Sequence, residues 1–160
     1  MTTEQTFKDS EILRYARHDR PEVVLAWLEN GADVNARDEI GNTPLHHAAH
    51  YSRNTELAPL LLSHGADVNA RSKDNWTPLH LAVIRGPGCE DLVDLLLDHG
   101  ANPTVDTYSL ASSGWTLLDV IMRYAQLGSG RYQAIAERIR HDYPEEFMKW
   151  WLRRSKGTGT

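Results

Sequence analysis

The stretch that decides the fold is "GADVNAR" at residues 31–37, because the same seven residues return at 65–71, 34 positions later. A weaker echo, "GANP", follows at 100–103. Self-similarity at an interval of this size is typical of chains built from stacked supersecondary units, each too small to bury its own apolar face. The sequence therefore predicts a repeat architecture.

A second phrase recurs at the same interval. "TPLHHAA" begins at Thr43 and "TPLHLAV" begins at Thr77, again 34 positions apart. Threonine is a preferred N-cap, because its hydroxyl accepts a hydrogen bond from an unpaired backbone N–H of the first turn. Pro44 and Pro78 then stand at the first helical position, where a missing N–H costs nothing. Each phrase therefore predicts the start of a helix.

A leucine-rich stretch completes each unit, "NTELAPLLLSHG" at 54–65 and "EDLVDLLLDHG" at 90–100. The glycine that ends each stretch suits the left-handed residue that closes a helix. Pro59 lies about one turn into the first stretch, and a proline in a helix interior costs about 3 kcal/mol. We therefore expect a bent or late-starting helix there, within a unit of helix, turn, helix and hinge.

These phrases resemble the ankyrin-repeat signature, since both "D-x-x-G-x-TPLH-x-A-A" and "LLL-x-x-GADVNA" occur at consistent offsets. The resemblance is close over about 31–102, fair over 10–30 and loose beyond 114. It implies an all-α solenoid of about four helix-turn-helix repeats, whose thin first helices and hinge tips line a concave face. We expect one domain over 1–160, with repeats at about 5–37, 38–70, 71–103 and 114–142.

The first and last repeats depart from the pattern. In the first, Ser10 stands where Thr43 stands in the second, which predicts a helix start there. In the fourth, Thr116 follows an insertion at 104–113, and "TLLD" replaces "TPLH". The resemblance implies that this replacement marks a last repeat.

The segment "PEEFMKWWLRRS" at 144–155 lies outside the repeats and predicts a terminal helix, because proline and two acids begin it and basic residues end it. We expect residues 144–154 to cap the last repeat through one apolar stripe, with Trp150 pointing away. The alternative is a helix that binds a partner or a membrane surface. The stripe consists of Phe147, Met148, Trp151 and Leu152.

The composition narrows the function classes. A net charge of −5 disfavours a nucleic-acid binder, although a local basic patch remains an alternative. A single cysteine, Cys89, excludes an internal disulfide and suits a reducing compartment. Neither a secretory signal nor a membrane-length apolar run is seen, so we expect a cytoplasmic protein. The basic patch would consist of Arg37, Arg71, Lys73 and Arg85.

The eight histidines raise the question of a metal site. In "HHAAH", His46 and His50 are one helical turn apart, a spacing that can present two imidazoles to one ion. The resemblance, however, assigns His46 and His80 to hydrogen bonds at the helix start, and neither a cysteine nor a pair of carboxylates completes a ligand set. Hydrolase, P-loop and dinucleotide motifs are absent as well. We therefore expect no metal, no cofactor and no enzyme; the alternative is a metal-dependent or redox enzyme.

The candidate recognition residues occupy positions that vary within the family, namely the hinge tips and the last residues of each first helix. Trp76 and Trp115 directly precede Thr77 and Thr116, so stacking would set them side by side, about 10 Å apart. Trp, Tyr and Arg are enriched at binding hot spots. The alternative is that each indole folds back onto its own repeat. The expected partner-binding set is Arg17, His18, Glu39, Ile40, Asn42, His50, Tyr51, Lys73, Asp74, Trp76, Ile84, Arg85, Tyr108 and Trp115.

The function that these features predict is recognition of a partner protein through the concave face and hinge tips. We expect a stand-alone module, monomeric when free, that occupies, scaffolds or inhibits its partner. A dedicated inhibitor, such as an immunity or antitoxin protein, is the alternative within this class. Metal analysis of the purified protein would separate both from the enzyme alternative.

Overall fold

The computed structural model describes residues 2–51, 56–105 and 115–155. Helices are the only regular elements in these ranges, which confirms the predicted all-α class. The helices are α1 (Thr3–Arg17), α2 (Pro21–Glu29), α3 (Pro44–Tyr51), α4 (Leu57–Ser63), α5 (Pro78–Ile84), α6 (Glu90–Asp98), α8 (Leu117–Gln126), α9 (Gly130–Asp142) and α10 (Pro144–Ser155).

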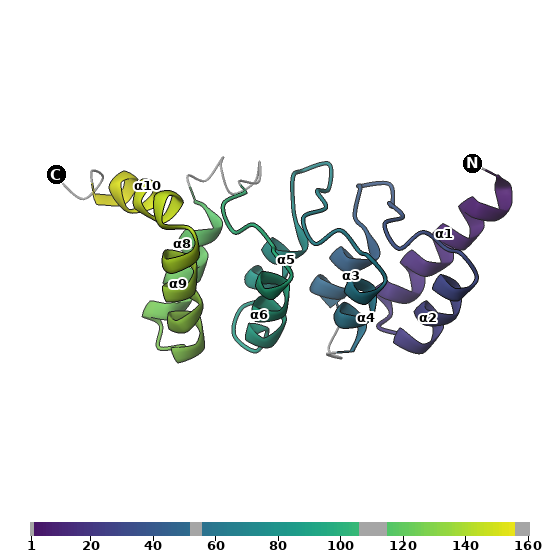
Figure 1. The fold of residues 1–160 in the computed structure, drawn as a ribbon, viewed down its shortest axis with the longest axis horizontal. Coiled ribbons are helices and arrows are strands. Elements are labelled where there is room, and N and C mark those ends of the chain that lie inside the picture. The colour runs from purple at the N-terminus through teal and green to yellow at the C-terminus, as the bar shows by residue number, and fades with distance from the viewer. Residues whose placement is uncertain (1, 52–55, 106–114, 156–160) are drawn as a thin grey trace.

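The helices stand in pairs along the long axis of the molecule, from α1 and α2 at one end to α8 and α9 at the other (Figure 1). The hinge loops between pairs project to one side. First helices of successive pairs pack on one another, so that α3 lies against both α1 and α5. The predicted ankyrin solenoid of four helix pairs is confirmed.

The Thr-Pro-Leu-His phrases start helices as predicted. The Thr77 hydroxyl accepts the His80 backbone N–H, and Nδ1 of His80 accepts the Thr77 backbone N–H. His46 likewise accepts the backbone N–H of Thr43. Because Nδ1 is the acceptor in each ring, Nε2 carries the proton, and it donates to a carbonyl of the next hinge, 2.9 Å away for His46 and 2.8 Å away for His80.

The hinge asparagines join consecutive repeats. Asn35 Nδ2 donates to the carbonyl of Gly65 (3.2 Å), and Asn35 Oδ1 accepts the backbone N–H of Asp67 (2.8 Å). Asn69 makes the same two bonds to the hinge at 100–102. The repeated "GADVNAR" phrase thus recurs because one amide side chain satisfies two backbone groups of the following hinge.

The first helix begins earlier than predicted. Ser10 does not cap it, since α1 begins at Thr3, about two turns before, and the Ser10 hydroxyl donates to the carbonyl of Phe7 inside the helix. Thr2 is the N-cap instead, and its side chain accepts the backbone N–H of Gln5. The prediction of a helix start at Ser10 was therefore wrong.

The added turns of α1 do for the first hinge what Asn35 does for the second. Gln5 Nε2 donates to the carbonyl of Gly31 (3.3 Å). The backbone N–H of Asp33 donates to Asp9 Oδ1 (3.0 Å). No repeat precedes α1 in the described chain, so side chains of an extended helix take the place of a hinge asparagine.

Pro59 is accommodated because α4 starts late, as expected. The helix begins at Leu57, so Pro59 occupies its third position, where the backbone N–H would have no partner within the helix. Its neighbours Leu57 and Leu61 are fully buried in the core that runs through the stack.

The terminal helix α10 packs through a different face from the one predicted, with Trp150 and Phe147 half-buried. None of its residues is fully buried, and Met148, Trp151 and Leu152 of the apolar stripe are exposed. Trp150 instead packs against the core with its ring 5.3 Å from that of Phe147. The assignment failed because it counted apolar surface only, whereas a hydrogen bond from its indole N–H lets Trp150 face inward.

Candidate functional site

A groove of about 250 Å³ opens between two hinge tips and the helices α3 and α5. Six of its lining residues belong to the set predicted for partner binding. We call it the tip groove; it is lined by Ile40, Asn42, His46, His47, His50, Tyr51, Ser72, Asp74, Trp76 and Leu81.

Hydrogen bonds hold the backbone of Trp76 in the wall of the tip groove. Ser72 bonds it twice, as its hydroxyl accepts the Trp76 N–H (3.1 Å) and its own N–H donates to the Trp76 carbonyl (2.9 Å). His46 donates to the same carbonyl. The half-buried indole meets the ring of His80 edge-on at 5.9 Å.

The neighbouring tip is joined to the Trp76 tip through its backbone. The N–H of Lys73 donates to the carbonyl of Ile40 (2.9 Å). Gly41 adopts a φ of +83°, and a Cβ there would lie 3.1 Å from the Lys73 nitrogen. Only glycine fits this approach without strain, so the tips form a rigid rim.

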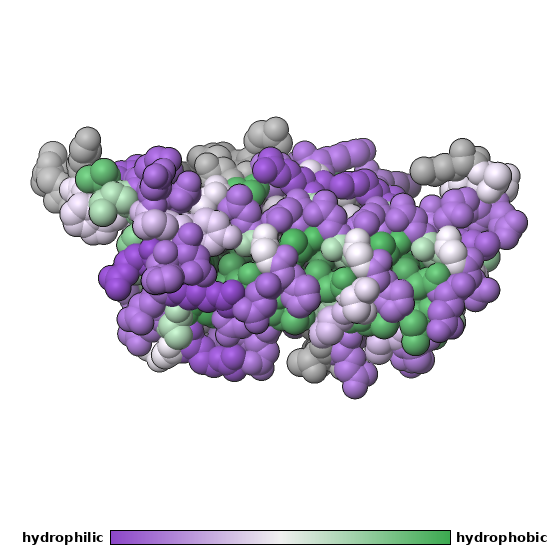
Figure 2. Space-filling view, in the orientation of Figure 1, coloured by the Kyte–Doolittle hydropathy of each residue, from purple (hydrophilic) through white to green (hydrophobic). Residues whose placement is uncertain are grey.

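Some of the large apolar side chains that reach solvent lie at the predicted positions, and others lie on α1, at the end of α8 and on α10. In the described ranges they include four members of the predicted set: Ile40 (59% exposed), Tyr51 (43%), Ile84 (42%) and Trp115 (37%). Figure 2 shows a band of apolar atoms across α2, α4 and α6. That band comes from half-buried side chains packed on the core, since none of the exposed large apolar residues lies on these helices.

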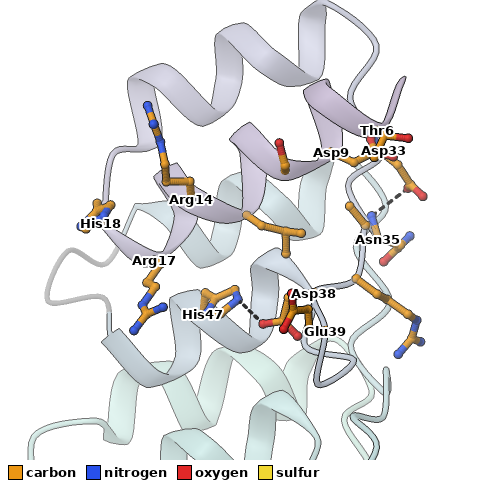
Figure 3. A pocket seen from close by; sticks show the side chains of 14 residues that line it. Thr6, Asp9, Arg14, Arg17, His18, Asp33, Asn35, Asp38, Glu39 and His47 are labelled. Atoms are coloured by element: carbon orange, nitrogen blue, oxygen red, sulfur yellow. Dashed lines mark hydrogen bonds and ion pairs between the residues drawn. The ribbon is translucent and has the colours of Figure 1, made fainter. Parts of the chain in front are cut away.

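A second groove, of about 960 Å³, lies between α1, the hinge at 33–39 and α3 (Figure 3). We call it the N-terminal groove. It contains three further residues predicted to bind a partner, namely Arg17, His18 and Glu39. Its lining is Thr6, Asp9, Ser10, Leu13, Arg14, Arg17, His18, Asp33, Asn35, Ala36, Arg37, Asp38, Glu39 and His47.

Comparison with known proteins agrees with this architecture. A family model described as ankyrin repeats, in three copies, matches residues 12–107, which is more than half of the chain. The chain belongs to the ankyrin-repeat family. Over 52 residues it is 48% identical to an ankyrin repeat protein of fowlpox virus (strain NVSL). That stretch is 32% of this chain and 10% of the viral protein, so the chain matches only a small part of that relative.

His47 links the two grooves of this ankyrin-repeat protein, and the sequence did not single it out. Its side chain is 8% exposed, and Nε2 lies 3.0 Å from Asp38 Oδ2. Burial lowers the pKa of His47, and the nearby Asp38 carboxylate opposes this only in part. Nδ1 is buried and has no hydrogen-bond partner among the residues that the structure describes. The only sequence signal was a histidine at a freely variable position of the "TPLHHAA" phrase.

The predicted residues outside the grooves have mixed surroundings. Arg85 donates to the carbonyl of Ala49 (3.1 Å), so it ties the end of α5 to α3. Lys73 is exposed at a hinge tip. Tyr108 lies outside the described residues.

The two tryptophans expected to lie side by side have different neighbours. The Trp76 ring contacts His80 of its own repeat. Trp115 is flanked by the guanidinium groups of Arg123 (5.8 Å) and Arg154 (6.0 Å). Trp115 therefore stands beside α8 and α10.

Asp119 attaches α10 to the last repeat of the ankyrin stack. This aspartate, the last letter of "TLLD", accepts the backbone N–H (2.6 Å) and hydroxyl (2.9 Å) of Thr116, as His80 does for its own threonine. It also accepts Trp150 Nε1–H (2.8 Å) and Arg154 Nε–H (2.7 Å). Burial alone would raise the pKa of Asp119, but the bonds from Arg154, Thr116 and Trp150 outweigh it and lower the pKa to about 2.

The histidine pair considered for a metal is divided in the ankyrin fold. His46 is fully buried and both ring nitrogens have protein partners, Thr43 and the Trp76 carbonyl, whereas His50 is exposed. Within the described ranges, no group of three or more metal-ligating side chains converges. In those ranges, too, each helix falls short of the length and hydropathy that a bilayer crossing needs.

Proposed function

We propose that this ankyrin-repeat chain recognises a partner protein through its concave face, with the tip groove at the centre of the contact. The observation that supports it is the gathering of Ile40, Tyr51 and Trp76 around one groove, at positions predicted from the repeat pattern. Exposed aromatic and aliphatic side chains beside a pocket are the usual anchors of protein interfaces.

The rigidity of the rim supports the proposal. Backbone bonds join Ser72 to Trp76 and Ile40 to Lys73, so both tips are ordered before a partner arrives. A preformed surface loses little conformational entropy on binding, which leaves more of the contact energy as affinity. On this proposal the chain acts by occupying or scaffolding its partner.

The test is affinity capture of a partner with the full chain. The affinity of that partner for variants of the chain is then measured. Trp76→Ala should weaken binding at least about thirtyfold, the loss typical of a truncated hot-spot tryptophan. Ile40→Ala should also weaken it, and because Ile40 is mostly exposed it should leave the melting temperature unchanged. Trp115→Ala should weaken it less, since that ring lies toward α10.

The matched control is Leu127→Ala, which removes another exposed apolar side chain (71% exposed) at the turn after α8. It should bind normally. If the Ile40→Ala and Trp76→Ala variants bind the partner as tightly as the unaltered chain does, the recognition face lies elsewhere.

A further inference from the structure

The C-terminal ends of α1 and α3 meet in a cationic and aromatic cluster. Arg17 is the last residue of α1 and Tyr51 the last of α3, and the guanidinium carbon lies 5.4 Å from the centre of the Tyr51 ring. His50 meets the same ring edge-on at 4.3 Å. We call Arg17, His50 and Tyr51 the Arg17 platform.

The Arg17 guanidinium differs from Arg14 and Arg37 in having neither a hydrogen bond nor an ion pair with any residue in the described ranges. Arg14, one turn earlier, is bonded to Glu11 and to the Tyr15 hydroxyl. Arg37 donates to two backbone carbonyls. Stacking on an aromatic ring leaves the edge N–H groups of a guanidinium available to a carboxylate.

Acids of the N-terminal groove do not neutralise the platform. Figure 3 shows Arg17 and Asp38 on opposite sides of the His47 ring. The Asp38 carboxylate accepts from the backbone of Ile40 and Asn42 and pairs with His47. The oxygens of Asp38 are therefore occupied by the hinge backbone and by His47, and not by Arg17.

We infer that the Arg17 platform is a subsite for a carboxylate of the partner protein, next to an apolar side chain held in the tip groove. Tyr51 carries the argument, because it lines the tip groove and also supports the guanidinium. The two subsites are thus contiguous, and they fit an acidic residue beside an aliphatic or aromatic one. This inference rests on the proposed function and specifies the chemistry of the partner.

The experiment selects a phage-displayed library of random 12-residue peptides on the immobilised full chain. Enriched peptides should carry Asp or Glu beside an apolar residue. A synthetic peptide of that sequence should bind Arg17→Gln about tenfold more weakly, since hydrogen bonds to charged groups contribute that much. Replacing the acidic residue of the peptide by its amide should weaken binding to the unaltered chain by the same factor. It should leave binding to the Arg17→Gln variant unchanged.

Arg14→Gln is the matched control, because it removes the same charge three residues earlier on α1. An equal loss on Arg14→Gln would reduce the effect to general electrostatics and overturn the inference. Peptides that depend on Trp76 but carry no excess of acids would overturn the subsite and leave the proposed function standing. Failure to enrich any peptide on the unaltered chain would count against both.

Discussion

The two ends of the stack are closed by different means. At the N-terminal end, α1 is extended, and Gln5 and Asp9 make the hydrogen bonds that a preceding hinge asparagine would make. At the C-terminal end a separate helix, α10, is attached through Trp150 and Arg154 to the single carboxylate of Asp119. One end is closed by continuing an element that is already packed, the other by adding an element with no fully buried residue.

An interior repeat and the last repeat differ at the residue that bonds to the next element. His80 donates Nε2–H to the carbonyl of Val105, because a hinge follows its repeat. Asp119 holds the same position in its repeat, but it accepts N–H groups, because helix side chains follow. The residue at the end of the Thr-Pro-Leu-His phrase is therefore a donor where a backbone carbonyl packs next and an acceptor where N–H groups pack next.

Lowering the pH should have the largest effect on stability, and this effect should come from the interior repeats and not from the C-terminal end. Burial lowers the pKa of His46 and His80 from 6.5 to about 4, so only the unfolded chain gains these protons between those pH values. Stability should therefore fall between pH 6.5 and 4, by about 3 kcal/mol for each histidine. Urea unfolding at pH 7.5 and 4 measures this fall.

Two variants test which residues cause the loss of stability in acid. His80→Gln should remove the share of the fall that His80 contributes, about 3 kcal/mol, and leave the shares of His46 and His47. Asp119→Asn should leave it unchanged, because the pKa of Asp119 moves from 3.8 to about 2 and its contribution is lost only below pH 3.8. A fall that His80→Gln does not alter would show that other groups govern it.

Asp119→Ala should destabilise the chain by about 2 kcal/mol. It removes a helix cap at Thr116 and leaves the N–H donors of Trp150 and Arg154 without their acceptor. Denaturant unfolding measures the loss. In a chain that ends at residue 143 the same substitution should cost only about 1 kcal/mol, the value of the cap.

That truncated chain is itself informative, since removal of α10 uncovers the core contact of Trp150 and should lower the melting temperature. Equal costs of Asp119→Ala in the full and truncated chains would mean that α10 is held by something other than Asp119.

Asp9→Ala should have the smallest effect, about 1 kcal/mol, because it removes an exposed hydrogen bond to the first hinge and a contact with Gln5. The control is Glu4→Ala on the same helix, whose exposed carboxylate pairs, among the described residues, with half-buried Lys8 alone. Amide hydrogen exchange at Asp33 should quicken in Asp9→Ala alone. Unchanged exchange there would contradict the account of the N-terminal end.

Periodic positions could be predicted from the sequence because their partners are supplied by the repeat itself. Thr77 caps its own helix, and Asn69 bonds to the hinge one repeat later. The tip-groove residues Ile40, Tyr51 and Trp76 were predicted on the same ground. Where one repeat follows another, a residue's neighbours are known once its place in the unit is known.

The sequence by itself thus determined the all-α class, the stacked helix pairs, the hinge chemistry and the positions around the tip groove. Only the tertiary structure decided the extended start of α1, the inward face of α10 and the link that His47 makes between two grooves. The physical reason is that these depend on contacts between segments without a periodic relation. Trp150 turns inward because Asp119, 31 residues earlier, accepts its N–H. The pattern of hydrophobic residues along a single helix cannot predict such a partner.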